Sequence, residues 1–402
     1  MTAAPARSAE PPFSGSYAPR DCTFLLKALC LEQTSSLVLS EVEGRMHDLD
    51  AGRPSTSLRT NGKIEAGTFV DVTTKEALIQ SGRRHYSEML SPEAPPGDDY
   101  LRLYEEALGR NGARLAQDVV DLAGALAERA GGREEVVIAS LARAGTPIGA
   151  LIRRALLRLG KASTHYSISI IRDRGIDREA LRHIAQRHDP RDVVFVDGWT
   201  GKGTITRELH SSLTDRPFGF EPFLAVIADP AGCADLAPSD EDYLIPSGLL
   251  NAIVSGLVSR SVLNDELVGP GDFHACVHYR HLAAQDRSRD FVERVDAPMS
   301  SMQPRKIAPR DRAPRARACE DMVRQIMTDC GLSDRNRIKP GVAEATRAVL
   351  RRVPDRLLIK DPMDPDVAHL VLLARERGVT IDPLPGGHGY RAVAVIRSLG
   401  LD

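Results

Sequence analysis

One stretch of the sequence decides how the rest of the chain is interpreted: Val193-Val194-Phe195-Val196-Asp197-Gly198-Trp199-Thr200-Gly201-Lys202-Gly203-Thr204-Ile205. Its four leading apolar residues predict a strand that is buried on both faces of a sheet. An acid, a turn rich in glycine and threonine, and a helix from about residue 206 follow. Glycines let several backbone N–H groups converge on one volume, and the start of a helix adds positive charge there. The stretch therefore predicts a phosphate-binding loop, with a plain strand-to-helix turn as the alternative.

Two common phosphate motifs do not fit this stretch. The G-x-x-x-x-G-K-[ST] spacing of Walker loops is absent, and the dinucleotide fingerprint would need a third glycine. The order of hydrophobic strand, acid and T-G-x-[GT]-T instead resembles the phosphoribosyl-diphosphate (PRPP) loop of type I phosphoribosyltransferases. The resemblance implies the parallel sheet of those enzymes.

Composition bounds the class of protein. The chain has 402 residues, a formal net charge of −2 and 42% hydrophobic residues. These values predict two or three domains, and they exclude a global charge that draws the protein to nucleic acid or membrane. No apolar run reaches the length of a membrane span, and the N-terminus lacks the hydrophobic region of a signal peptide. Six cysteines are scattered without a C-x-x-C pair, so we expect a cytoplasmic protein without membrane contact.

The hydrophobic pattern divides the chain into four regions. Residues 1–130 form an N-terminal extension and hood, with an insertion predicted at 33–68 and two helices between residues 100 and 130. Residues 131–300 alternate strands with helices, which predicts a doubly wound parallel α/β sheet, and they end in a mixed part with a helix at 252–263. Residues 301–331 are basic and rich in proline, which is typical of a linker. Residues 332–402 predict a small α/β domain.

A second anion site is predicted where the strand at 135–139 ends. Parallel strands carry their ligand sites at their carboxyl ends, and small residues with one arginine suit an anion. The strand at 164–171 ends in a charged segment that we expect to be mobile. The residues concerned are Arg143, Ala144, Gly145 and Thr146 at the first strand, and Arg172, Asp173 and Arg174 at the second.

The chemistry of PRPP assigns a task to each group. Arg143, with neighbouring amides and Mg²⁺, would neutralise the diphosphate. Asp197 would accept hydrogen bonds from the ribose hydroxyls, while Arg172, Asp173 and Arg174 would close over the leaving group and complete the catalytic set. The 5′-phosphate would bind the loop. The predicted PRPP-binding residues are Arg143, Ala144, Gly145, Thr146, Asp197, Gly198, Trp199, Thr200, Gly201, Lys202, Gly203 and Thr204.

Longer motifs extend the resemblance to most of the chain. Residues 13–30 and 71–300 are similar to the phosphoribosyltransferase-like domain of the tellurite-resistance-associated StiP family. The motifs are FSGSY at 13–17, SGRRHYSEML at 81–90, SLARAGTPIG at 140–149, HYSISIIRDRGID at 165–177 and VDGWTGKG at 196–203. The resemblance implies an orotate-phosphoribosyltransferase-like fold and a stress-linked role in making or modifying a nucleotide-like metabolite. The family has also been labelled a cysteine protease.

One position departs from the type I pattern. The usual pair of acids in the PRPP loop is here Asp197 and Gly198, so one carboxylate is missing. Protein side chains alone are therefore not expected to hold the magnesium. It would arrive on PRPP, with Asp197 and Asp229, or Asp173, as the carboxylates nearest to it. The same departure leaves room for a nucleotide sensor without turnover.

The C-terminal region resembles the pelota-type, L7Ae-like RNA-binding module. GVAEATR at 341–347 is similar to its G-x-N-E-x-T-K helix start, and IKDPMDP at 359–365 to its acidic turn. Ala343 replaces the Asn that faces RNA bases in such modules. The resemblance implies RNA contact through a helix N-terminus and basic side chains. The candidates are Lys339, Gly341, Glu344, Thr346 and Arg347.

Three functional hypotheses follow. The first is a Mg²⁺-dependent phosphoribosyltransferase that uses PRPP or a related ribose phosphate on an unknown base-like acceptor, as a homodimer. The second is a nucleotide-sensing, RNA-binding regulator. The third is a cysteine protease, which needs a thiolate beside a histidine and would draw on Cys22 or Cys233 with His85 or His165. His274, Cys276 and His278 could bind a metal, but strand alternation alone would place them on one face.

Overall fold

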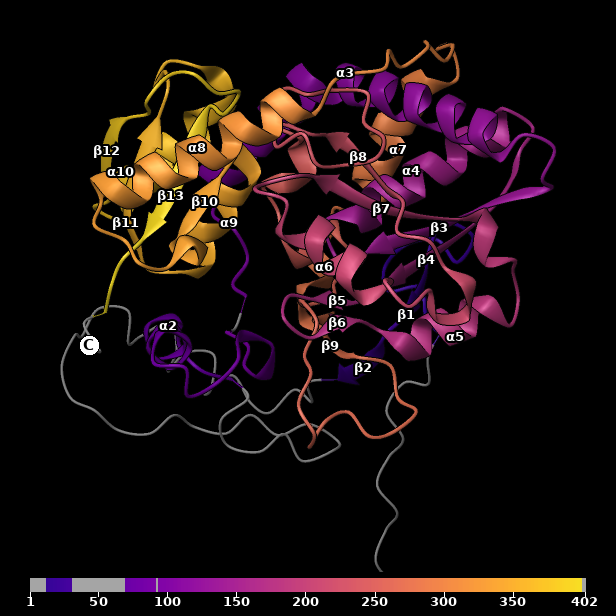
Figure 1. The fold of residues 1–402 in the computed structure, drawn as a ribbon, viewed down its shortest axis with the longest axis horizontal. Helices are drawn as coiled ribbons and strands as arrows, with labels where there is room; N and C mark the ends of the chain where they lie inside the picture. Colours follow the sequence, from indigo (N-terminus) through magenta and orange to yellow (C-terminus); the bar gives the residue numbers. More distant parts are fainter. Residues whose placement is uncertain (1–11, 31–68, 92, 400–402) are drawn as a thin grey trace, which may run out of the picture.

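The computed structural model describes residues 12–30, 69–91 and 93–399. The larger domain is built on a five-stranded sheet in the order β1-β4-β3-β7-β8, and each neighbouring pair is parallel (Figure 1). The predicted parallel α/β class is therefore confirmed. The strands are β1 (Thr23–Leu25), β3 (Glu135–Leu141), β4 (Ala162–Ile168), β7 (Val193–Trp199) and β8 (Leu224–Ala228).

The continuous apolar strands fill two cores, because successive side chains point to opposite faces. Val194 and Val196 belong to the core under α3 (Asp98–Ala130), α4 (Gly145–Arg158) and α7 (Ser288–Met299). Val193 and Phe195 belong to the core under α5 (Arg178–Ala185) and α6 (Thr204–Ser212). Helices thus cover both faces, as the doubly wound prediction requires.

Small elements complete this domain. A parallel pair joins β2 (Lys27–Cys30) to β9 (Ala275–His278), and an antiparallel pair joins β5 (Ile170–Ile171) to β6 (Gly175–Ile176). The helix α2 (Val72–Gln80) lies below the C-terminal domain in Figure 1.

The C-terminal domain has its own four-stranded sheet in the order β10-β13-β11-β12. Its helices are α8 (Ala313–Asp329), α9 (Val342–Arg351) and α10 (Ala368–Glu376), and its strands are β10 (Ile338–Pro340), β11 (Pro354–Ile359), β12 (Thr380–Pro383) and β13 (Ala392–Ile396). Apolar residues of α8 cover one face of the sheet, and those of α9 and α10 cover the other. The small C-terminal α/β domain is confirmed.

The two domains share one apolar core. Val342 and Val349 of α9 lie in the same buried cluster as Leu244 and Leu249 of the larger domain. The Glu76 carboxylate of α2 is fully buried and pairs with Arg352, which adds a charged contact between distant parts of the chain. The C-terminal domain is therefore docked and not merely tethered.

Several sequence predictions of local structure are wrong. Residues 98–130 form one helix that continues through Gly109 and Gly112, because an interior glycine costs a long packed helix only about 1 kcal/mol. The predicted linker contains α8, whose residues Cys319, Val323 and Ile326 are buried against the C-terminal sheet. Residues 252–263 form no α-helix but a 3₁₀ turn, Ala252–Val254, followed by isolated β-bridges at Val258 and Val262. The insertion predicted at 33–68 lies outside the described residues.

Candidate phosphate and ribose site

The candidate site lies where the strand order changes direction. After β3 the chain adds β4 on one side, and β7 and β8 lie on the other. Ligands of open parallel sheets bind outside the carboxyl ends of the strands at such a point. The two predicted anion segments, residues 143–146 and 200–204, both follow strands of the sheet there. Gly145 makes their approach possible, because a Cβ atom at this position would be 2.3 Å from the Val196 carbonyl oxygen.

The phosphate loop, residues 200–203, offers unpaired backbone donors. In the described part of the chain, the N–H groups of Gly201, Lys202 and Gly203 have no hydrogen-bond acceptor. Gly203 has φ of 72° and precedes α6, whose N-terminus has no side-chain cap. The left-handed residue turns the chain so that these donors and the helix start form a concave anion site.

A buried carboxylate holds this loop from behind. Asp229 accepts hydrogen bonds from Thr200 Oγ1 (2.6 Å) and from the backbone N–H groups of Cys233 and Ala234 (both 3.0 Å). Its oxygens are thus engaged with the protein. Among the described residues, no three His, Cys, Asp or Glu side chains gather as a metal site. Asp229 therefore fits the role of loop support better than the predicted role of magnesium ligand.

Asp197 lies in β7, which continues for two residues beyond it to Trp199, just before the phosphate loop. It is half-buried, and its Oδ1 accepts a hydrogen bond from the Gly198 N–H (2.8 Å). Burial raises the pKa of Asp197 to about 7, although the Gly198 N–H and the nearby Arg347 favour the charged form. A carboxyl group with this pKa can accept or donate a hydrogen bond near neutral pH.

Arg143 leads the second loop, and its peptide bond to Ala142 is cis. The guanidinium is buried and forms a two-pronged ion pair with Glu93, with one Nη1–Oε2 distance of 3.1 Å. It also donates to the Val258 carbonyl (2.7 Å). The predicted diphosphate residue is therefore at the site, but a carboxylate from residue 93 already occupies its fork.

The charged segment at 172–174 is not a free loop. It is the turn of the β5–β6 hairpin, and the Arg172 N–H donates to Tyr86 Oη (2.8 Å). Asp173, with φ of 65°, donates its N–H to Glu208 (2.7 Å), and Arg174 pairs with Glu88 (2.7 Å). Side chains from two other segments, residues 86–88 and α6, thus hold the turn in this conformation, and its mobility stays a prediction. Arg172 remains close enough to lower the pKa of Lys202.

The C-terminal domain covers the phosphate loop. Lys202 Nζ donates to the Ile338 carbonyl (2.8 Å) and to the Arg335 carbonyl, and Tyr390 Oη donates to the Gly201 carbonyl (2.6 Å). Burial, assisted by Lys339 and Arg335, lowers the pKa of Lys202 to about 6. Lys202 therefore joins the two domains and does not point into open solvent.

Helix α9 faces the same place. Trp199 Nε1 donates to Glu344 (3.4 Å), and the Arg347 guanidinium lies 4.5 Å from the centre of the Trp199 ring. The carboxylate of Asp242, from the larger domain, caps α9 by accepting from the Val342 N–H (2.9 Å) and also accepts from the Arg391 N–H (2.9 Å). Contacts of this kind fix the helix over the site.

The predicted RNA-binding residues lie at this interface. Gly341 is next to Asp242, and Glu344 and Arg347 contact Trp199. Thr346 is fully buried and bonds His369 Nε2 (2.6 Å). Lys339 is half-buried, and burial lowers its pKa to about 8. RNA contact through these residues would require the two domains to separate.

Sequence reasoning missed Glu93, Arg260 and Arg351. Arg260 donates to the Tyr86 carbonyl (2.5 Å), and burial lowers its pKa to about 10. Arg351 is four residues after Arg347 on α9, and this helical spacing was the one available signal. Glu93 and Arg260 belong to no motif.

The cysteines predicted for proteolysis are not activated. Burial raises the pKa of Cys22 and raises that of Cys233 to about 12. His165 bonds Ser140 Oγ (2.7 Å) and the Asp21 carbonyl (2.7 Å), and His85 Nδ1 bonds Ser87 Oγ (2.8 Å). No hydrogen bond joins either thiol to either histidine among the described residues.

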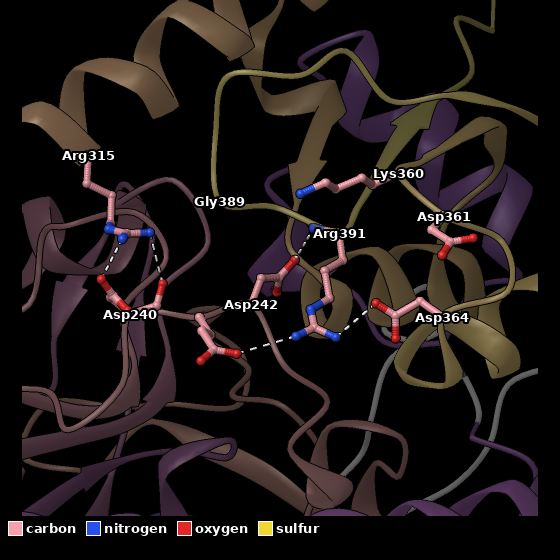
Figure 2. Close-up of a pocket in the computed structure, with 9 residues that line it drawn as sticks. Asp240, Asp242, Arg315, Lys360, Asp361, Asp364, Gly389 and Arg391 are labelled. Atoms are coloured by element: carbon pink, nitrogen blue, oxygen red, sulfur yellow. Dashed lines mark hydrogen bonds and ion pairs between the residues drawn. The ribbon is translucent and has the colours of Figure 1, made fainter.

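A separate cavity of about 430 Å³ lies at the rim of the domain interface (Figure 2). Its charged groups largely pair with one another, as in Arg315 with Asp240 (2.5 Å) and Arg391 with Asp364 (2.9 Å). None of residues 197–204 lines it.

The described helices include none that is long and apolar enough to cross a membrane.

Comparison with known proteins places the chain in a family. The family described as "Tellurite-like stress resistance cysteine protease StiP" matches residues 62–296, and the PELOTA RNA binding domain matches residues 317–398. A protein of Acinetobacter baylyi (strain ATCC 33305 / BD413 / ADP1) named "Cysteine protease StiP" is 38% identical over 408 residues, which are 96% of this chain and 95% of the relative. The chain belongs to the StiP family. The resemblances to the StiP family and to the pelota-type RNA-binding module are thereby confirmed.

Solved structures similar to this StiP-family chain include phosphoribosyltransferases. Hypoxanthine phosphoribosyltransferase of Trypanosoma cruzi is 16% identical and matches 33% of this chain and 82% of its own, with a TM-score of 0.26. The HGPRT-ase of Leishmania tarentolae in complex with GMP is 11% identical over the same shares, with a TM-score of 0.25. The assignment of the parallel α/β class rests on the strand order described above.

Proposed function

We propose that this StiP-family protein binds PRPP or a related ribose phosphate and transfers its phosphoribosyl group to a base-like acceptor. The phosphate loop carries the proposal. It combines three unpaired N–H groups, a left-handed glycine and an uncapped helix start beside Asp197, at the point of the sheet where ligands bind.

The proposed reaction balances as a substitution at C1′. The bond from C1′ to the diphosphate oxygen breaks, and its electron pair leaves with the diphosphate. A ring nitrogen of the acceptor forms the new C1′–N bond, and the proton of that nitrogen passes to solvent. Asp197 would bind the ribose hydroxyls, and the loop would hold the 5′-phosphate. Arg143 would lie on the side of the leaving group.

Magnesium stays a prediction, and no step above depends on it. Asp197 is the carboxylate that could reach an ion carried by PRPP, because Asp229 supports the loop and Asp173 lies in the hairpin turn. A bound magnesium ion would add positive charge at the diphosphate. The cytoplasmic location and the homodimer also remain predictions.

Two glycine variants test the site. Gly203→Ala places a methyl group 3.2 Å from Cys233 Sγ and Arg207 Nη1 at φ of 72°. We expect it to weaken PRPP binding by about 10-fold or more, because the donors must converge on one phosphate. Gly160→Ala is the matched control, since its φ is 73° and its Cβ has no neighbour within 4 Å.

Calorimetric titration of PRPP, with and without Mg²⁺, measures both variants, and Trp199 fluorescence follows binding in parallel. Equal affinities for Gly203→Ala and Gly160→Ala would contradict the loop assignment. Tight binding of PRPP without turnover on any nucleobase would favour the nucleotide sensor.

A second candidate is the protease named in the family description. The pairs predicted from sequence would join Cys22 or Cys233 to His85 or His165. Neighbouring cysteine and histidine residues can form a nucleophile and its base. The raised pKa of both thiols argues against this candidate.

Peptide hydrolysis by the full chain tests this candidate. We expect a Cys22→Ser, Cys233→Ser variant to keep any hydrolysis that the wild type shows, because burial raises the pKa of both thiols. Hydrolysis that is lost in this variant would favour the protease.

A further inference from the structure

Helix α9 brings two arginines to the ligand end of the larger domain's sheet. Arg347 lies against Trp199 at the end of β7, and Arg351 is one helical turn further along the same face. Arg143 and Arg260 approach from the larger domain. These groups interact electrostatically. Burial is the main cause that lowers the pKa of Arg351, and Arg143 and Arg347 lower it further.

Several donors in this cluster have no partner. Among the described residues, Nε and Nη2 of Arg351 and Nε of Arg347 and Arg143 are buried without a hydrogen-bond acceptor. A buried guanidinium N–H that has lost water and gained no acceptor is costly. Proteins place such donors where a ligand supplies the missing acceptors.

Positive charge exceeds negative charge in the cluster. Glu93 is committed to Arg143, and Glu344 lies 4.0 Å from Arg347. Asp197 faces Arg347, but burial raises its pKa to about 7 and so reduces its negative charge near neutral pH. Burial, with Arg260 and Arg351 nearby, lowers the pKa of Lys75 to about 7. The cationic side chains of the cluster therefore outnumber its anionic ones.

We infer that the C-terminal domain supplies part of an anion site, in which Arg351 and Arg347 bind a diphosphate group together with Arg143. The ligand rests on the proposed function, since PRPP carries its diphosphate on the carbon opposite its 5′-phosphate. Arg143 follows β3 and the phosphate loop follows β7, so the two neighbouring strands would hold the two ends of one molecule. Arginine suits this task because its planar fork matches phosphate oxygens.

The assignment gives the C-terminal domain a role in binding the ligand. A domain that matches an RNA-binding family here closes a small-molecule site with its helix α9. The cap from Asp242 and the Lys202 contacts then serve to position Arg347 and Arg351.

Binding of three probes to the full chain tests the inference: inorganic pyrophosphate, PRPP and ribose 5-phosphate. We expect Arg351→Ala to weaken pyrophosphate and PRPP binding by about 10-fold or more, the loss expected for one charge-assisted hydrogen bond. Ribose 5-phosphate binding should not change. Arg375→Ala, an exposed arginine on α10, is the matched control and should change none of the three.

The outcomes separate this inference from the proposed function. Pyrophosphate that fails to bind the wild type, or binds Arg351→Ala as tightly, overturns the anion site even if ribose 5-phosphate binds. Pyrophosphate binding that depends on Arg351 supports the site even if ribose 5-phosphate fails to bind, a result that would refute the loop proposal. If Arg351→Ala does not fold, Arg351→Lys and Arg347→Ala are measured, and unchanged pyrophosphate affinity in both overturns the inference.

Discussion

Replacing Asp242 by alanine should weaken the contact between the two domains and lower the free energy of unfolding by about 2–5 kcal/mol, since two buried N–H groups would lose their acceptor. The carboxylate is 6% exposed and accepts from Val342 and Arg391 of the C-terminal domain. Loss of the α9 cap adds to the cost. Urea unfolding followed by circular dichroism gives the change, and Trp199 fluorescence reports whether Arg347 has moved from the indole ring.

Asp240→Ala is the matched control for this prediction. Asp240 is two residues earlier, but its side chain is 36% exposed and pairs with Arg315 at the rim of the interface. Exposed ion pairs contribute about 0–1 kcal/mol. Equal losses in the two variants would show that Asp242 is not a principal contact between the domains.

Replacing Asp197 by asparagine should stabilise the protein and impair its ligand binding. Burial raises the pKa of Asp197 to about 7, whereas the unfolded carboxyl titrates near 4. Between these values the folded state holds more protons than the unfolded state, so the free energy of unfolding falls as pH rises from about 4 to 7. Asparagine does not titrate, so the variant does not lose this part of its free energy of unfolding.

The expected gain is about 1–2 kcal/mol at pH 8, less than the full shift implies because the carboxyl is only half-buried, and it should shrink at pH 5. PRPP affinity should fall by about 10-fold or more, since the amide replaces an acceptor of the ribose hydroxyls by a donor. Urea unfolding at both pH values and calorimetry measure the two effects. Asp215→Asn, whose side chain is 62% exposed, controls for net charge. A pH-independent difference in stability would contradict the raised pKa.

Local signals predicted the sheet and the strand, turn and helix at residues 193–212 well. Apolar runs such as residues 193–196 can be satisfied only by burial on both faces, and the glycines that follow permit few turns. Composition alone gave a wrong prediction for residues 301–331, where packing decides the structure. The proline and arginines near residue 313 suggested a linker, yet Pro314 lies in the first turn of α8, where it costs no hydrogen bond.

The closed form of the site could not be predicted from sequence. Glu93 and Arg143 are separated by 50 residues, and Lys202 and Ile338 by 136. Neither pair has a spacing rule, because tertiary packing alone brings the partners together. The contacts of the segment at 172–174 could not be predicted for the same reason, as they come from Tyr86, Glu88 and Glu208.

The shared apolar core has a consequence for how the chain can be divided. Val342 and Val349 fill the same cluster as Leu244 and Leu249, so the boundary between the domains is not a boundary of cooperativity. A chain cut before α8 would expose these leucines as part of an apolar patch prone to association. The two halves should therefore melt in a single transition, and neither is a module that can be transplanted by itself.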